Sequence, residues 1–170
     1  MVLNKKENRL LITAIFFYVL MILYLKYNTV DDISICNIMK NKGKYVIISL
    51  LSLFSYFILE YEKKRKDNKS YYCLVLIVIS IFGLIIFLEN NLYHIIIAKM
   101  IFILILLFML WHFIKTKNKV LGIILLIELV VAVILEIKKR NNILIHEILF
   151  LILFAVYYFY LHYLHYFTHM

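Results

Sequence analysis

Long apolar runs separated by short, mostly basic gaps are the dominant pattern of the chain. Each run has about the length that a helix needs to cross a ~30 Å hydrocarbon core, at a rise of about 1.5 Å per residue. Strands of a membrane barrel would instead give short segments of alternating polarity. The pattern predicts an all-α integral membrane protein, a single membrane domain over residues 1–170. We expect a bundle of about six transmembrane helices at about 10–27, 45–61, 71–88, 92–114, 120–137 and 143–167.

The composition agrees with this class. Hydrophobic residues make up 65% of the 170 residues, and the mean hydropathy is +0.93, an excess that a water-soluble domain of this length cannot bury. There is no proline and there are three glycines, which suits uninterrupted helices. The net charge is +9, but the basic residues occupy the gaps between apolar runs. We therefore expect contacts with the lipid bilayer and its headgroups, and no binding of nucleic acid.

The distribution of Lys and Arg predicts an orientation, because these residues are enriched on the cytoplasmic side of membrane proteins. With a cytoplasmic N-terminus, the cytoplasmic gaps at 1–9, 62–69 and 115–119 carry eleven Lys and Arg. The outer gaps at 26–44 and 138–140 then carry seven. We therefore expect a protein of the plasma (inner) membrane with both termini in the cytoplasm.

Two stretches of the sequence resemble each other. Residues 42–68 and 117–142 both begin K-x-K, place a Leu-Leu pair at 50–51 and 125–126, and reach I-L-E before a basic cluster. One hypothesis is a duplicated three-helix unit, whose second copy would be inverted in the membrane, as in many secondary transporters. The other is chance similarity in a chain built from few residue types.

Ionisable side chains inside the apolar runs are candidate functional residues, because they are expensive in lipid. With a cytoplasmic N-terminus, this group falls in the outer half of the last three helices: His94, Lys99, Glu128, Glu136, His146 and Glu147. Lys99 and Glu128 have opposite signs on neighbouring helices. We expect them to form an ion pair that fixes helix packing, and the alternative is a proton- or ion-coupled site.

Histidine placement gives weaker hypotheses about a metal, and no cofactor is predicted. His94, Glu136, His146 and Glu147 are residue types that suit zinc, but neighbours on a helix point about 100° apart. Near the C-terminus, Tyr158, His162, His165 and His169 share one helical face. An aromatic belt at headgroup level is the favoured interpretation of this face. The alternatives are a metal site at His162 and His165, or haem held with His112.

The sequence contains no nucleophile elbow and no glycine-rich phosphate loop, so an enzyme is not the first hypothesis. Buried charges and the apparent repeat favour a transporter, a channel-like protein or a membrane subunit of a transport complex. The first alternative is a partner-binding membrane protein, such as an immunity or assembly factor, which docks on another membrane protein or on a second copy. The second is a membrane-embedded enzyme using His and Glu.

Overall fold

A computed structural model describes residues 5–27, 43–65, 67–87, 92–137 and 143–167, with the backbone alone at 5–6, 43–44, 136, 143–145 and 163–167. These residues form six helices and no strand: α1 (Lys5–Tyr27), α3 (Gly43–Arg65), α4 (Asn68–Ile86), α5 (Leu92–Thr116), α6 (Lys119–Ile137) and α7 (Ile143–Phe167). The expected all-α fold is confirmed. Four of the helices, α1, α3, α4 and α5, are long and apolar enough to cross a membrane.

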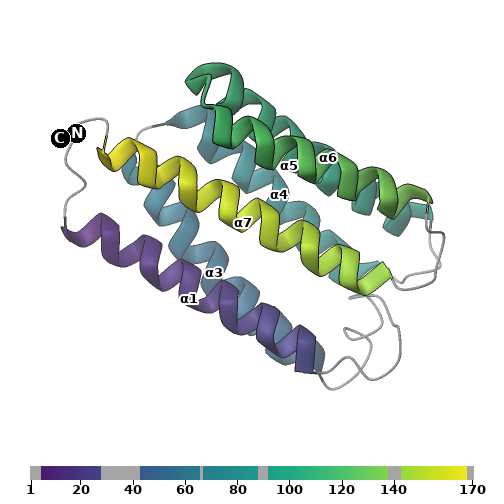
Figure 1. Ribbon diagram of the computed structural model, residues 1–170. Coiled ribbons are helices and arrows are strands. Elements are labelled where there is room, and N and C mark those ends of the chain that lie inside the picture. The colour runs from purple at the N-terminus through teal and green to yellow at the C-terminus, as the bar shows by residue number, and fades with distance from the viewer. Residues whose placement is uncertain (1–4, 28–42, 66, 88–91, 138–142, 168–170) are drawn as a thin grey trace.

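The helices pack as three successive pairs, α1 with α3, α4 with α5 and α6 with α7. Neighbouring helices in the chain run antiparallel, so the start of α1 and the end of α7 lie at the same end of the bundle (Figure 1). We call this the terminal end. It also holds the α3–α4 junction and the α5–α6 turn, and therefore gathers four segments that are distant in the sequence.

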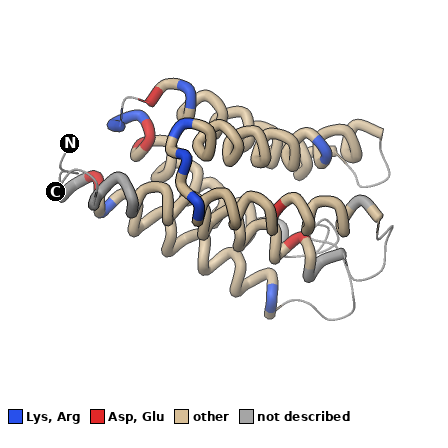
Figure 2. The backbone as a smooth tube through the Cα atoms, turned by 45° about the horizontal axis from the view of Figure 1, so that its top comes forward, with Lys and Arg blue, Asp and Glu red and all other residues tan. Residues whose placement is uncertain are grey.

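Each helix buries one stripe of residues at helical spacing. On α3 the stripe is Ile47, Leu51, Ser55, Ile58 and Glu62, in steps of three or four. The opposite faces are apolar as well, and they are exposed. Figure 2 shows long uncharged stretches along the helices, with most charged residues near helix ends. Soluble monomers seldom expose apolar surface on this scale, so the arrangement suggests a membrane protein.

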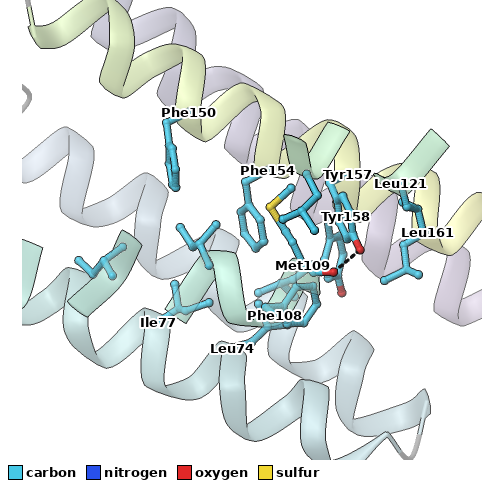
Figure 3. Packing of buried hydrophobic residues seen from close by; sticks show 14 of the residues in the cluster. Leu74, Ile77, Phe108, Met109, Leu121, Phe150, Phe154, Tyr157, Tyr158 and Leu161 are labelled. Carbon is cyan, nitrogen blue, oxygen red and sulfur yellow. Dashed lines mark hydrogen bonds between the residues drawn. The ribbon is translucent and has the colours of Figure 1, made fainter. Parts of the chain in front are cut away.

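Aromatic side chains fill the core between α5 and α7 (Figure 3). The rings of Phe108 and Phe154 meet edge to face, with centroids 5.8 Å apart. The hydroxyl of Tyr157 donates to the carbonyl oxygen of Met109 on α5. On the other side, the Tyr18 hydroxyl of α1 donates to a carbonyl of α7, that of Leu151, at 2.6 Å. These bonds connect α7 to α5 and to α1.

Three predicted helix boundaries were wrong at the terminal end. The α1 helix begins at Lys5 and not at residue 10. The α3 helix continues to Arg65, beyond the expected end at residue 61, because Glu, Lys and Arg are good helix formers. The α4 helix begins at Asn68 and not at 71, since the side chain of Asp67 accepts a hydrogen bond from the Ser70 N–H at 3.4 Å and caps it. Residues expected in a loop therefore lie in helices.

The two similar stretches do not pack alike. Aligned on their Leu-Leu pairs, Leu51 corresponds to Leu126. Leu51 is buried in α3, whereas Leu126 is 64% exposed on α6. The two helices thus present different registers of the shared pattern to the core.

A close contact beside the α5–α6 turn gives a test of this packing. A Cβ on Gly122 would lie 2.7 Å from Cε2 of Phe113, whereas one on Gly83 would lie 3.4 Å from Ile97 Cδ1, an ordinary contact. We expect Gly122→Ala to lower the free energy of unfolding by about 1–2 kcal/mol, because the ring must move. Gly83→Ala should be neutral or slightly stabilising. Thermal unfolding in detergent measures both, and equal effects would contradict the packing at Gly122.

Candidate functional site

A buried polar network lies at the terminal end, between α3 and α7. Its centre is Glu62, which continues the buried stripe of α3 four residues after Ile58. The side chain of Glu62 has no exposed surface. Opposite it, Tyr158 and His162 lie one helical turn apart on α7 and are also buried. The helical spacing of residues on α3 and α7 thus brings a carboxylate, a phenol and an imidazole together.

One carboxylate oxygen of Glu62 receives all the hydrogen bonds that the described residues donate to this side chain. The Tyr158 hydroxyl donates to Oε1, Arg65 Nη1 donates to it at 3.2 Å, and His162 Nε2 lies 3.3 Å from it. The other oxygen, Oε2, is buried and has no hydrogen-bond partner among the described residues. Three donors on one oxygen compensate for removing this charge from solvent.

The contacts with Arg65 and Glu62 favour one tautomer of His162. Nη1 of Arg65 lies 2.7 Å from Nδ1 of His162 and 3.2 Å from Nε2, and a guanidinium can only donate. Nδ1 makes the shorter of these contacts and accepts, whereas a proton on Nε2 faces the Glu62 carboxylate at 3.3 Å. The Tyr61 hydroxyl also lies 3.1 Å from Nδ1. Both ring nitrogens of His162 are thus engaged within the protein.

Further polar contacts join α4 and α5 beside this network. Ser70 Oγ and His112 Nε2 lie 2.9 Å apart, and His112 packs on the ring of Phe108. Nζ of Lys115 lies 3.5 Å from Oδ2 of Asp67. Partial burial raises the pKa of Asp67, but the N–H of Ser70 and the ammonium of Lys115 outweigh it, so the pKa lies below its usual range.

Glu128 lies elsewhere, at the midpoint of α6. It follows Leu121 and Leu125 on the buried stripe and has no exposed surface. Neither carboxylate oxygen has a hydrogen-bond partner among the described residues. The expected pair with Lys99 was wrong for the described chain, because Lys99 lies on an exposed face of α5. Which way a residue faces around its helix depends on packing, and the two charges face different surroundings.

The other predicted site residues differ in how deeply they are buried. His94 is buried, and its Nδ1 lies 3.2 Å from the carbonyl oxygen of Phe87, to which it can only donate. His146 and Glu147 are half-buried near the start of α7. The side chain of Glu136 lies outside the described residues. Glu128 forms no hydrogen bond with any of these that the structure describes.

The aromatic-belt interpretation was wrong for Tyr158 and His162, because both are buried and bonded to Glu62. Within the described ranges no three His, Cys, Asp or Glu side chains group as metal ligands. The side chain of His165 lies outside those ranges. Both ring nitrogens of His162 contact other side chains, so a metal or haem iron at His162 would have to displace one of these contacts.

The sequence hypotheses missed Glu62, Arg65 and Tyr61, which were assigned to the end of a helix and a charged gap. The signal was present in the stripe of α3, whose next step after Ile58 is position 62.

Comparison of the chain with protein-family models, with curated proteins and with solved structures finds no match.

Proposed function

We propose that this chain is a plasma-membrane transport protein with six transmembrane helices and a cytoplasmic terminal end. In this proposal Glu128 takes up and releases a proton or a small cation inside the bilayer. One observation carries it: a carboxyl group at the midpoint of α6 is fully buried, and neither oxygen has a described hydrogen-bond partner.

The apolar outer surface supports placement in a membrane. On α6 the exposed residues include Ile123, Val130 and Val133, and lipid is the solvent that accepts such a surface. With 19 residues, α6 spans about 28 Å, close to the hydrocarbon thickness. The excess of Lys and Arg in the gaps of the terminal end supports a cytoplasmic location for that end. The proposal does not require the two three-helix halves to be related.

The setting of Glu128 supports an exchangeable ion. An ionised carboxylate without hydrogen bonds is expensive in an apolar interior. The cost falls when a proton neutralises the group or when a cation joins it. A residue that serves only to fill the core needs no carboxyl group here, since Leu121, Leu125 and Val131 fill the same stripe with apolar side chains. Intramembrane carboxyls of this kind commonly mark ion pathways.

Purified protein in vesicles with a trapped dye that is sensitive to protons, to sodium or to potassium tests the proposal. We expect the wild-type chain to dissipate an imposed proton, sodium or potassium gradient, and Glu128→Gln to slow that flux at least tenfold. Gln keeps the size of the side chain but cannot exchange a proton. Glu60→Gln, a half-exposed position near the end of α3, is the matched control and should retain the wild-type rate.

Two outcomes overturn the proposal. One is a wild-type chain that carries none of the three ions. The other is a Glu128→Gln variant with unchanged flux, which would show that transport does not use this carboxyl. The first result, together with a stable co-purifying membrane protein, would favour the partner-binding alternative.

A further inference from the structure

Two basic segments that are far apart in the sequence form one surface at the terminal end. Lys115 of α5 reaches Asp67, the residue that caps α4, at 3.5 Å. Nζ of Lys69 lies 4.4 Å from the ring centroid of Trp111. These two contacts join the α3–α4 junction to the α5–α6 turn. The exposed or half-exposed lysines of the two segments, which we call the basic rim, are Lys63, Lys64, Lys69, Lys115, Lys117 and Lys119.

The basic rim has a large excess of positive charge. Among the described residues of the two segments, Glu62 is buried and bonded to Arg65, and Asp67 is paired with Lys115. The remaining lysines therefore present ammonium groups that these two carboxylates do not neutralise. In Figure 2, Lys and Arg from several helix ends gather toward this end of the bundle.

Trp111 places the basic rim at the boundary of the apolar surface. Its indole is exposed on the last turns of α5, beside the exposed Ile114 and Leu110. Tryptophan prefers the headgroup level of a bilayer, because its ring is apolar and its N–H is polar. The cation–π contact holds the Lys69 ammonium at that same level. The charges thus lie where the apolar outer faces of α4 and α5 end.

The positive charge of the α5–α6 turn is carried by lysine side chains. Asn118 Oδ1 accepts hydrogen bonds from the N–H groups of Val120 and Leu121, at 2.9 and 3.3 Å, so the start of α6 is already capped. Lys117 has a positive φ of 50°, a conformation that a lysine seldom adopts. The turn therefore carries Lys115, Lys117 and Lys119 within five residues, and the N–H groups of Lys117, Val120 and Leu121 already have acceptors within the chain.

We propose that the basic rim binds the phosphate headgroups of anionic phospholipids in the adjoining leaflet. Lysine ammonium groups beside a transmembrane segment attract such lipids, and continuity with the apolar outer faces favours a lipid over a soluble polyanion. The inference rests on the membrane placement in the proposed function. It does not depend on transport through Glu128.

Trp111, the single tryptophan of the chain, provides a local readout. The full chain is reconstituted in phosphatidylcholine vesicles that contain a low fraction of brominated phosphatidylglycerol or of brominated phosphatidylcholine. We expect the anionic lipid to quench Trp111 at a several-fold lower mole fraction. The preference should weaken with added sodium chloride, because salt screens exposed charges. Sodium phosphate at the same ionic strength should weaken it no further.

The test variant is Lys69→Gln/Lys117→Gln/Lys119→Gln, which keeps the Lys115–Asp67 contact between the two turns. It should lose at least tenfold of the preference for the anionic lipid. Lys26→Gln/Lys99→Gln, which changes two lysines outside the basic rim, is the control and should retain the preference. Each signal is normalised to the same protein in unbrominated vesicles.

Equal quenching of the wild-type chain by both lipids, or an unchanged preference in the triple variant, overturns the inference. Competition by free phosphate beyond that of sodium chloride also overturns it, because the ligand would then be the soluble ion. If neither brominated lipid quenches Trp111, the membrane placement itself fails. The failure of the lipid site and the failure of the proposed function are therefore distinguishable.

Discussion

Glu62→Ala is expected to destabilise the protein by about 3 kcal/mol, since it removes one partner of a buried charge network. The Glu62 side chain is fully buried and accepts hydrogen bonds from Tyr158, Arg65 and His162. Its loss leaves those donors without their common acceptor. Arg65 is 12% exposed and can turn partly toward solvent, which keeps the expected loss at the lower end for such a pair. Thermal or denaturant unfolding in detergent measures the change.

Glu60→Ala is the matched control, because it removes the same group two residues earlier from a half-exposed position. It should change stability by no more than about 0.5 kcal/mol. A double-mutant cycle of Glu62→Ala with Arg65→Ala isolates the pair, and the combined loss should be smaller than the sum of the single losses. Glu62→Ala with a loss no larger than that of Glu60→Ala would mean that the network does not hold α3 to α7.

The opposite sign is expected at Glu128. Glu128→Met should stabilise the folded chain by about 1–3 kcal/mol, because a fully buried carboxyl without described partners is replaced by an apolar group of similar length. Met is unbranched and can follow the path of the Glu side chain. The measurement is again unfolding in detergent, with Glu60→Met as the control at a half-exposed position.

Stability and transport should then separate at Glu128. If the proposed function is correct, Glu128→Met unfolds at a higher temperature than the wild-type chain and carries no ion. Such a trade-off is typical of residues kept for function at the expense of stability. A destabilised Glu128→Met variant would mean instead that the carboxyl makes a contact that supports the fold.

Much of the fold could be predicted from the apolar runs, and part of the candidate site could be predicted from helical spacing. The positions of Leu121 and Leu125 already place Glu128 on the same face of its helix. Ile58 does the same for Glu62, but this carboxylate was assigned to a charged gap because the helix was ended too early. Helix boundaries in charged segments depend on local capping, here by Asp67. The spacing of apolar residues carries no information about such a cap.

The facing of Lys99 could not be predicted in the same way. The helix pattern allows a lysine among apolar residues to face either the core or the outside, because its long side chain can reach toward a headgroup region. Packing of α5 against its neighbours turns this residue outward. The prediction of an ion pair with Glu128 depended on that rotation and was wrong for this reason.

By itself, the sequence determined that the chain folds into helices of membrane-spanning length, because the apolar runs and their period are local properties of the chain. It also places Glu128 on the same helical face as Leu121 and Leu125. Only the tertiary structure decided that Tyr158 and His162 meet Glu62, that Lys69 meets Trp111, and that Glu128 lies apart from Lys99. These contacts join segments about 40 to 100 residues apart, and their partners are chosen by how six helices rotate and slide against one another, which no local pattern encodes.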